Sequence, residues 1–265
     1  MNITIGKFIP LNSWMEKRDP RIKLVAMMAL IIATFIDIGF IGYGIIGLFI
    51  IVGLILSKVK FMMIIKSMRA MLFMMIFLFF VNIFVIKTGP VFINLGFMNI
   101  YTDSILQTLY IIVRLVIMIS LTTILTVSTK PMDLTFAIED LLTPLKVVKV
   151  PAHEIAMIIS IALRFIPTLL DEANRIMKAQ ASRGVDFQDG TLRDKIGSIL
   201  ALIIPLFASS FQRAEELADA MEARGYSPGE VRSRYRLFKI DFADIILLII
   251  SIIIFVGFIM YRIQM

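Results

Sequence analysis

The chain has no cysteine and a single histidine among its 265 residues. Without a thiol there can be no disulfide framework, no thiolate metal site and no cysteine nucleophile. One imidazole excludes a multi-histidine metal site, and His153, which follows Pro151 and precedes Glu154, is interpreted as an ordinary residue at the start of a helix. We therefore expect no metal ion, no cofactor and no catalytic residue in this chain.

The motifs of nucleotide-binding and hydrolytic enzymes are missing as well. There is no G-x-x-x-x-G-K-[ST] loop, so the chain is not expected to bind ATP in that way. An H-E-x-x-H motif, a Ser/His/Asp arrangement and a Gly-rich dinucleotide turn are also absent. The sequence therefore predicts a protein that is not an enzyme, and any ATP hydrolysis that it uses would have to occur in a partner.

What the chain does have is apolar residues. They make up 59% of the sequence, against about 45–50% in soluble domains. The net charge of +7 is interpreted as the positive excess of cytoplasmic loops rather than as a nucleic-acid-binding surface. The first 20 residues are polar, and no signal peptide is recognised in them. We expect an all-α polytopic protein of the cell membrane, in contact with the lipid bilayer.

Hydropathy predicts about five transmembrane helices. A single helix over the apolar run 24–56 would be about 50 Å long, too long for a hydrocarbon core of about 30 Å. Two short spans with a turn near residues 39–42 fit better. Residues 91–100 are too few for a span and predict a small hairpin, and Ser104 with Gln107 predicts a capping box before the fourth span. The remaining predicted spans cover residues 70–86, 105–127 and 240–261.

The charges that flank these spans predict their orientation. Five basic residues precede the first span, and the 57–69 loop carries four more and no acid. The 37–42 turn has none, and the 87–104 loop has only Lys87. By the positive-inside rule the N-terminus is cytoplasmic. Asp37 is then expected at an outer turn, and the basic cluster of residues 232–239 is expected at the cytoplasmic headgroup level.

A polar module is expected between the fourth and fifth spans. Residues 130–239 hold 15 of the 27 Lys and Arg residues and 14 of the 20 Asp and Glu residues. We divide the chain into residues 1–129, with four spans, a cytoplasmic or interfacial helical module of residues 130–239, and the last span in 240–265. Within the module, the apolar pieces 155–170 and 196–211 each contain a proline and are interpreted as helices buried against protein or lying at the membrane boundary.

The module contains one short pattern twice. Ser182-Arg183-Gly184 and Ala223-Arg224-Gly225 end two Ala-rich runs, and the Arg-Gly pairs lie 41 residues apart. Glycine is common just after a helix, and arginine in the last turn complements the helix dipole, so capping alone explains one such end. The alternative is docking, because an arginine at a helix tip can pair with a partner's carboxylate or carbonyls. The alanines fit close helix crossing or plain helix propensity equally well.

Arg114 lies inside the fourth predicted span. A charge within the membrane is costly, and it is a functional-site hypothesis by default. The alternative, which we favour, is a structural ion pair or a side chain that extends to the membrane interface.

Several runs together resemble the transmembrane T component of energy-coupling factor transporters. Residues 19–24 (Asp-Pro-Arg-Ile-Lys-Leu) resemble its D-P-R-x-K-L entry to the first span, and residues 162–167 (Ala-Leu-Arg-Phe-Ile-Pro) resemble its A-L-R-F-I-P segment. Residues 180–184 and 222–226 resemble its two A-R-G motifs, with Ser182 in place of the first alanine.

The resemblance implies a non-catalytic scaffold that couples two ABC-type ATPase subunits to a membrane-embedded, substrate-binding S component for vitamin or metal-ion uptake. It assigns ATPase docking to Arg183 and Arg224, with Ser182, Gly184, Ala223 and Gly225 shaping the helix ends. A stand-alone carrier or channel is the alternative, although beyond Arg114 the spans offer few of the polar residues that it would need.

Overall fold

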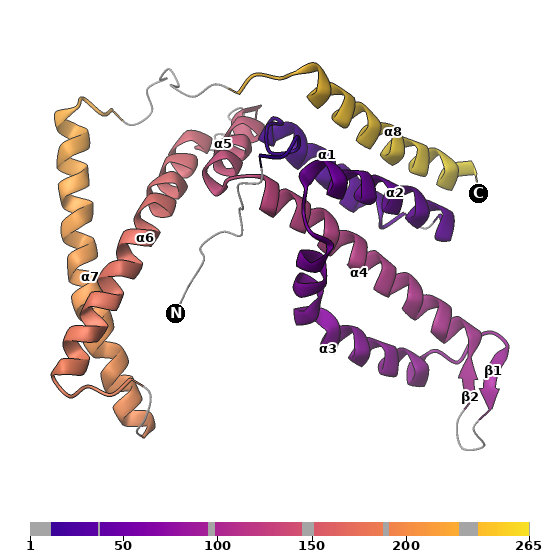
Figure 1. Ribbon diagram of the computed structural model, residues 1–265, viewed down its shortest axis with the longest axis horizontal. Coiled ribbons are helices and arrows are strands. Elements are labelled where there is room, and N and C mark those ends of the chain that lie inside the picture. The colour runs from indigo at the N-terminus through magenta and orange to yellow at the C-terminus, as the bar shows by residue number, and fades with distance from the viewer. Residues whose placement is uncertain are drawn as a thin grey trace. The chain divides into compact units, whose positions relative to one another are not determined.

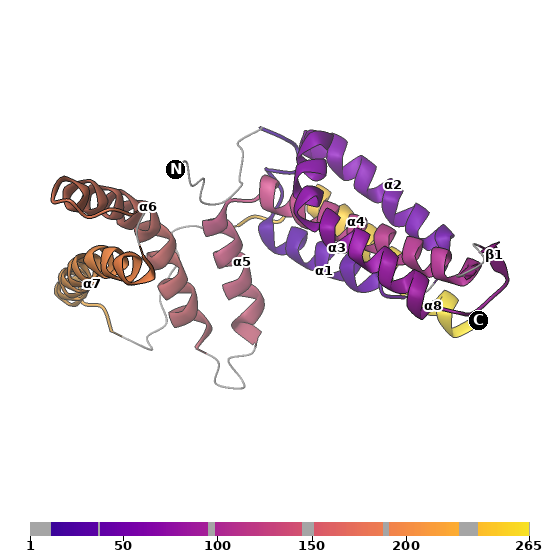
Figure 2. The ribbon, with the colours of Figure 1, turned by 90° about the horizontal axis from the view of Figure 1, so that it is seen from below.

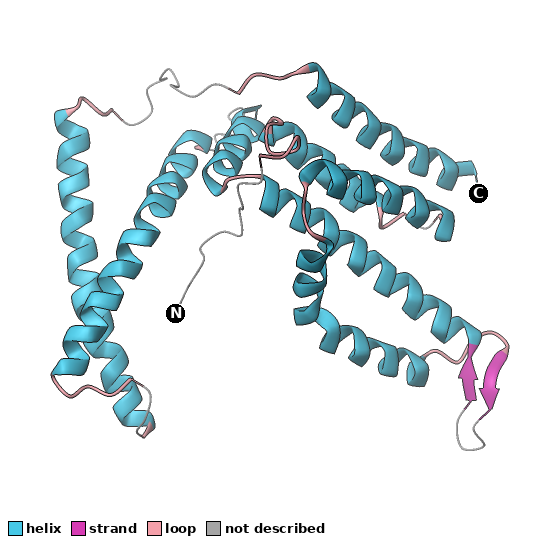
Figure 3. Ribbon diagram, viewed as in Figure 1, coloured by secondary structure: helices cyan, strands magenta, loops and turns pink. Residues whose placement is uncertain are grey.

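The computed structural model describes residues 12–36, 38–94, 99–144, 151–187, 191–227 and 238–264. In these residues the secondary structure is almost entirely helical, with one small two-stranded sheet (Figures 1 and 3). The chain divides into two compact units. Unit 1 comprises Met1–Leu141 and Phe238–Met265, and unit 2 comprises Leu142–Leu237. The predicted all-α membrane architecture is confirmed, and unit 2 is a single insertion into unit 1.

Unit 1 is a bundle around α4 (Thr102–Ser128). Helix α1 (Pro20–Ala33) packs against α4 and α8 (Phe242–Gln264), and α2 (Phe40–Ser57) packs against α4 (Figure 2). Small side chains on α1 allow its neighbours to approach closely. The shared core is apolar and almost closed to solvent, and its most buried members are Ala26, Leu30, Ala33, Ile46, Ile117 and Leu121.

The predicted division of the first apolar run into two helices is confirmed. Helix α1 ends at Ala33, and α2 begins at Phe40 after Gly39, whose φ of 74° is in the left-handed region. The break lies slightly before the predicted turn, and Asp37 lies outside the described residues. With 14 residues α1 is only about 21 Å long, shorter than the hydrocarbon core of a bilayer.

Helix α3 and the hairpin follow. The two parts of α3 (Phe61–Val85), Phe61–Arg69 and Met71–Val85, are inclined by 62°. The loop predicted over residues 57–69 is helical from Phe61, and the second part of α3 agrees with the third predicted span, 70–86, to within one residue at each end. Strands β1 (Val91–Asn94) and β2 (Asn99–Tyr101) pair antiparallel, which confirms the predicted hairpin, although its turn lies outside the described residues.

The capping box predicted at Ser104 is wrong. Helix α4 begins earlier, at Thr102, and its N-cap residue Tyr101 makes no side-chain capping bond. Ser104 lies inside the first turn, where its buried hydroxyl donates to the Tyr101 carbonyl over 2.7 Å. The strand β2 runs directly into the helix, so pairing within the hairpin determines where α4 starts.

Unit 2 consists mainly of α6 (Ala152–Ser182) and α7 (Leu192–Ala223), which pack against each other (Figure 2). Helix α5 (Pro131–Leu142) precedes them, and all but its last residue belongs to unit 1. A capping box starts α7, because the Thr191 side chain accepts from the Asp194 N–H and the Asp194 side chain accepts from the Thr191 N–H.

The two apolar pieces of unit 2, residues 155–170 and 196–211, are helical, as predicted. They lie in helices of 31 and 32 residues that continue through Pro167 and Pro205. A proline removes one backbone donor, and the other bonds of a long helix keep it continuous. Within the described residues, five helices are long and apolar enough to cross a membrane: α2, α4, α6, α7 and α8. The bent helix α3 would be a sixth if its two parts formed one span.

Candidate functional site

The first Arg-Gly pair ends α6 in a complete Schellman motif. Arg183 closes the helix with φ −91° and ψ 6°, and Gly184 follows with φ 87°. The Gly184 N–H donates to the Ala181 carbonyl over 3.0 Å, and the Val185 N–H donates to the Gln180 carbonyl over 3.1 Å. These two bonds satisfy carbonyls that the end of a helix would otherwise leave without a partner.

The second pair ends α7 in the same way. Arg224 has φ −89° and ψ 10°, and Gly225 has φ 69°. The Gly225 N–H donates to the Glu222 carbonyl over 2.8 Å, and the Tyr226 N–H donates to the Met221 carbonyl over 3.0 Å. The sequence repeat is therefore also a repeat of backbone geometry, with each arginine as the last residue before the turn.

Backbone conformation, and not space, explains the two glycines. A Cβ atom added at Gly184 or Gly225 would meet no other atom within 4 Å. The positive φ is nevertheless unfavourable for any residue with a side chain, by about 1 kcal/mol. The capping interpretation of both glycines is thus confirmed, while docking stays a prediction.

The surface of the two helix ends is open. All six predicted docking residues are exposed: Ser182, Arg183, Gly184, Ala223, Arg224 and Gly225. The Ser182 hydroxyl donates to the Lys178 carbonyl over 3.1 Å, one turn back in α6. Among the described residues, no side chain holds the guanidinium of Arg183 or Arg224. Both cations are therefore available to a partner without breaking an internal ion pair.

Helices α6 and α7 pack against each other, line a common groove and are joined by an ion pair. Ala214 and Ala218 of α7 line the groove together with Phe165 of α6. Beside it, Arg213 Nη2 lies 3.5 Å from Glu172 Oε2 and joins the two helices. Ala179, Ala181 and Ala220, which also belong to the Ala-rich runs, do not line this groove, and all five of these alanines are exposed.

Large apolar side chains remain exposed along both helices. Ile204 and Phe207 of α7 are 64% and 62% exposed. Exposed apolar side chains in this number are unfavourable in water, and they suit contact with lipid or with protein. The other members of this surface are Ile158, Ile159, Ile196, Ile199, Leu200, Ile203 and Phe211.

A second polar site lies in unit 1, and the sequence revealed it only through the resemblance of its D-P-R run. Asp19 caps α1 by accepting the Arg21 N–H over 2.9 Å, and its own N–H donates to Asp244 Oδ1 over 3.2 Å. Arg18 Nη1 donates to Asp241 Oδ2 over 2.8 Å, and this interaction holds the pKa of Asp241 below its usual value. An acid followed by proline, with further acids at the start of the last span, is the signal that sequence reasoning could have used.

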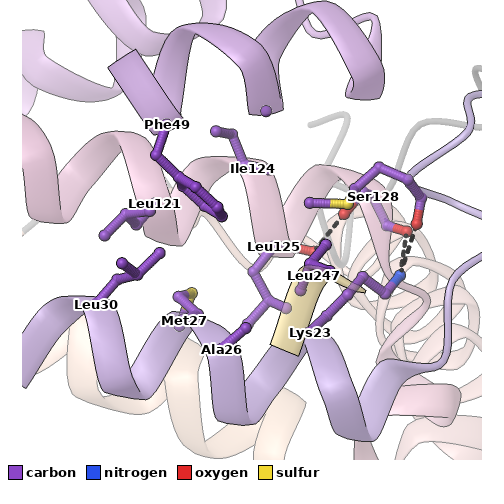
Figure 4. Close-up of a pocket in the computed structure, with 12 residues that line it drawn as sticks. Lys23, Ala26, Met27, Leu30, Phe49, Leu121, Ile124, Leu125, Ser128 and Leu247 are labelled. Atoms are coloured by element: carbon purple, nitrogen blue, oxygen red, sulfur yellow. Dashed lines mark hydrogen bonds between the residues drawn. The ribbon is translucent and has the colours of Figure 1, made fainter. Parts of the chain in front are cut away.

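Lys23 extends this site into the bundle. Its side chain is almost fully buried, and Nζ donates to the Met15 carbonyl over 3.2 Å and to the Ser128 carbonyl over 3.1 Å (Figure 4). A cavity of about 30 Å³ lies beside it, lined by Leu30, Leu121 and other apolar side chains. Lys23 thus connects the segment before α1 to the end of α4.

Arg114 lies among aromatic side chains of unit 1. Its Nε donates to the Tyr43 hydroxyl over 3.2 Å, and its guanidinium carbon lies 5.3 Å from the centroid of the Phe35 ring. Both contacts are compatible with the structural interpretation, and a functional role for Arg114 stays a prediction.

In the described ranges, no group of three or more His, Asp or Glu side chains is arranged to hold a metal ion.

Comparison with known proteins assigns a family to this architecture. A family profile described as CbiQ, cobalt transport protein, matches residues 11–235. The chain is 41% identical over 235 residues to the energy-coupling factor transporter transmembrane protein EcfT of Bacillus subtilis strain 168, which covers 89% of each chain. Identity is 44% over 239 residues with EcfT of Macrococcus caseolyticus, covering 89% of each chain, and 42% over 258 residues with EcfT of Staphylococcus aureus, covering 96% of each chain.

The predicted resemblance is confirmed by these matches, which extend over both units of the structure. The apolar helices and the transporter relatives together indicate a multi-pass membrane protein. The chain therefore belongs to the CbiQ family, and within it to the transmembrane proteins of energy-coupling factor transporters.

Proposed function

We propose that the chain is the coupling subunit of an energy-coupling factor importer of the ABC type. In this role it passes the ATP-driven motion of two ATPase subunits to a membrane-embedded S component that binds a vitamin or a metal ion. The observation that carries the proposal is the pair of matching, exposed helix ends at Arg183 and Arg224. Two equivalent ends suit two equivalent partners.

The chemistry of each end supports docking. A guanidinium offers five N–H donors in a planar fork, which suits a carboxylate or a set of backbone carbonyls. The glycine turns the chain away directly after the arginine, so the last turn of the helix projects as a tip. Because neither guanidinium is held by an internal ion pair in the described part of the chain, docking replaces only water.

The lack of a phosphate-binding loop gives the second argument. The chain has no motif of its own for ATP, so energy for transport has to arrive through contact with another protein. Under the positive-inside rule the N-terminus and both arginine tips lie in the cytoplasm of the cell, where ATP is available. The exposed apolar surface of α6 and α7 is then suited to the bilayer and to an S component within it.

The test is a charge reversal at both ends, Arg183→Glu with Arg224→Glu. Each reversal removes a central cation from its interface, which we expect to cost about 2 kcal/mol of binding free energy or more. Co-purification of the ATPases and uptake should both be lost, while the amount of the chain in the membrane stays unchanged. Full association and uptake by the double variant would refute the docking assignment.

A matched control keeps the same change of charge on the same two helices. Lys178→Glu lies on α6 and Lys195→Glu on α7, and both side chains are exposed. We expect this variant to retain the ATPases, because neither residue lies in the last turn of its helix, next to the glycine turn. A separate experiment tests the alternative of a stand-alone carrier. Substrate uptake into liposomes that contain the unmodified chain without any ATPase would contradict the proposal.

A further inference from the structure

The chain passes between the two units twice. It leaves unit 1 after Leu141 and returns to it at Phe238. If unit 2 receives motion from a partner, that motion enters unit 1 through these two crossings. What holds the crossings therefore decides whether motion of unit 2 is transmitted or dissipated.

One side chain contacts both crossings. Arg21 Nη1 lies 3.3 Å from Asp140 Oδ2, just before the chain leaves unit 1. Arg21 Nη2 donates over 3.3 Å to the carbonyl of Phe238, the residue at which the chain returns. The guanidinium carbon also lies 5.8 Å from the centroid of the Phe238 ring. Asp140 and Phe238, which lie 119 and 217 positions after Arg21 in the sequence, thus contact the same guanidinium.

The guanidinium is itself held firmly. Arg21 Nη2 lies 2.7 Å from Asp19 Oδ2, and Nε donates to Asp19 Oδ1 over 3.1 Å. The Asp19 side chain is 0% exposed, so this pair is shielded from solvent on the carboxylate side. A two-pronged contact of this kind fixes the plane of the guanidinium, and with it the direction of the remaining donors.

Asp19 belongs to the packed part of unit 1, where it is buried. It caps α1, and its backbone N–H donates to Asp244, which also accepts the Asp241 N–H over 2.9 Å at the start of α8. The anchor thus rests on the starts of two packed helices and not on an exposed loop. The outer contact of Arg21 with Asp140 is more open, with side chains 26% and 21% exposed, and contributes little to folding stability.

We propose that Arg21 is a positioning residue that clamps both crossings to the start of α1, so that motion of unit 2 reaches unit 1 through one fixed base. This inference rests on the proposed coupling function. Without the clamp the two crossings no longer share one anchor, so less of the motion of unit 2 reaches unit 1. The clamp therefore acts on the coupling between ATP hydrolysis and transport and not on docking.

The first experiment compares Arg21→Ala and Arg21→Lys in the complete transporter. We expect co-purified ATPase to be unchanged and uptake per ATP hydrolysed to fall about tenfold in Arg21→Ala, within the range of ordinary coupling energies. Arg21→Lys keeps the charge without the planar fork and should lie between. Loss of the complex together with uptake would mean a merely structural role and would overturn the proposal, as would unchanged uptake per ATP.

Asp241→Asn is the matched control. It weakens an ion pair of 2.8 Å with Arg18 at the start of α8, next to the clamp, and leaves every contact of Arg21 in place. We expect uptake per ATP to change less than about twofold, because the pair is exposed on the Asp241 side. A tenfold loss in this control would assign the effect to the region as a whole and not to Arg21.

A second measurement tests the clamp without any partner. The chain has no cysteine, so Pro144→Cys and Lys239→Cys, both at exposed positions beside the crossings, allow specific spin labelling. Dipolar EPR should give a narrow distance distribution with Arg21 and a clearly broader one with Arg21→Ala, while Asp241→Asn leaves it narrow. Equal widths would overturn the clamp. If Arg21→Ala broadens the distribution but the chain with Arg21 fails to co-purify an ATPase, the clamp is supported and the proposed function is refuted.

Discussion

Both units contain many apolar residues, and the two units use them in opposite ways. In unit 1 the side chains of Leu30 and Ile46 are 1% and 0% exposed and form a shared core. In the described part of unit 2 only Ala156 and Ser198 are buried, and residues such as Ile204 face outward. Unit 1 therefore has a packed core of its own, whereas the described residues of unit 2 leave most of their apolar side chains exposed.

Charged residues divide along the same boundary. The acids and bases at the starts of α1 and α8 contact one another in a half-buried network. In unit 2 the arginines at the two tips have no such contact in the described residues and face solvent. Interior charges of this kind determine a geometry, while exposed ones remain available for recognition, so the division supports a scaffold role for unit 1 and a contact role for unit 2.

The largest expected effect tests the packing of the two units directly. Leu30→Ala removes a fully buried side chain from unit 1 and should lower the free energy of unfolding by about 3 kcal/mol. Ile204→Ala, at a 64% exposed position of α7, should change it by less than about 0.5 kcal/mol. Thermal unfolding of the purified chain in detergent measures both. Equal losses would show that unit 2 has a core of its own.

A smaller effect is expected at the polar network. Asp19→Ala removes the α1 cap and leaves Arg21 without its main partner, which should cost about 2 kcal/mol. Asp241→Asn is the comparison, because the Asp241 side chain is 66% exposed and its loss should cost about 0.5 kcal/mol or less. The same unfolding measurement applies. A tolerant Asp19 and a sensitive Asp241 would reverse our assignment of interior and surface roles.

The smallest effect is expected at the helix tips. Gly184→Ala and Gly225→Ala each place a side chain in the left-handed region, at a cost of about 1 kcal/mol. Since no atom lies within 4 Å of the added Cβ, the cost should appear as local fraying of the last turn and not as global unfolding. Hydrogen exchange at the ends of α6 and α7 measures it. A fall in overall stability instead would mean that the tips are integral to packing.

Local patterns predicted those parts of the fold that local chemistry determines. The break before α2, the hairpin of β1 and β2 and the two glycine turns each follow from a few neighbouring residues. The apolar pieces 155–170 and 196–211 were also delimited locally, although α6 and α7 continue well beyond them and through both prolines. In a helix of this length the bonds on either side of a proline outweigh the one that it removes.

The polar network could not be predicted in the same way. Asp19 and Asp244 are separated by 225 positions, and no spacing rule connects them. Their contact exists because α1 and α8 pack together, which is a result of the whole bundle. For the docking tips the reverse holds: the sequence repeat identified them, and the structure added their backbone geometry and exposure without testing their partner.

The glycine turns also determine the length of α6 and α7, and with it the position and orientation of each helix end. A residue added to a helix advances its end by about 1.5 Å and turns it by about 100° around the helix axis. Because Gly184 and Gly225 determine where each helix ends, they also determine the angular position of Arg183 and Arg224 around the helix axis. One alanine inserted within α6 or α7 would leave every residue at the helix end unchanged and rotate that end by about 100° around the helix axis. In this protein the length of each helix is therefore as important for the orientation of its arginine as the residues at its end.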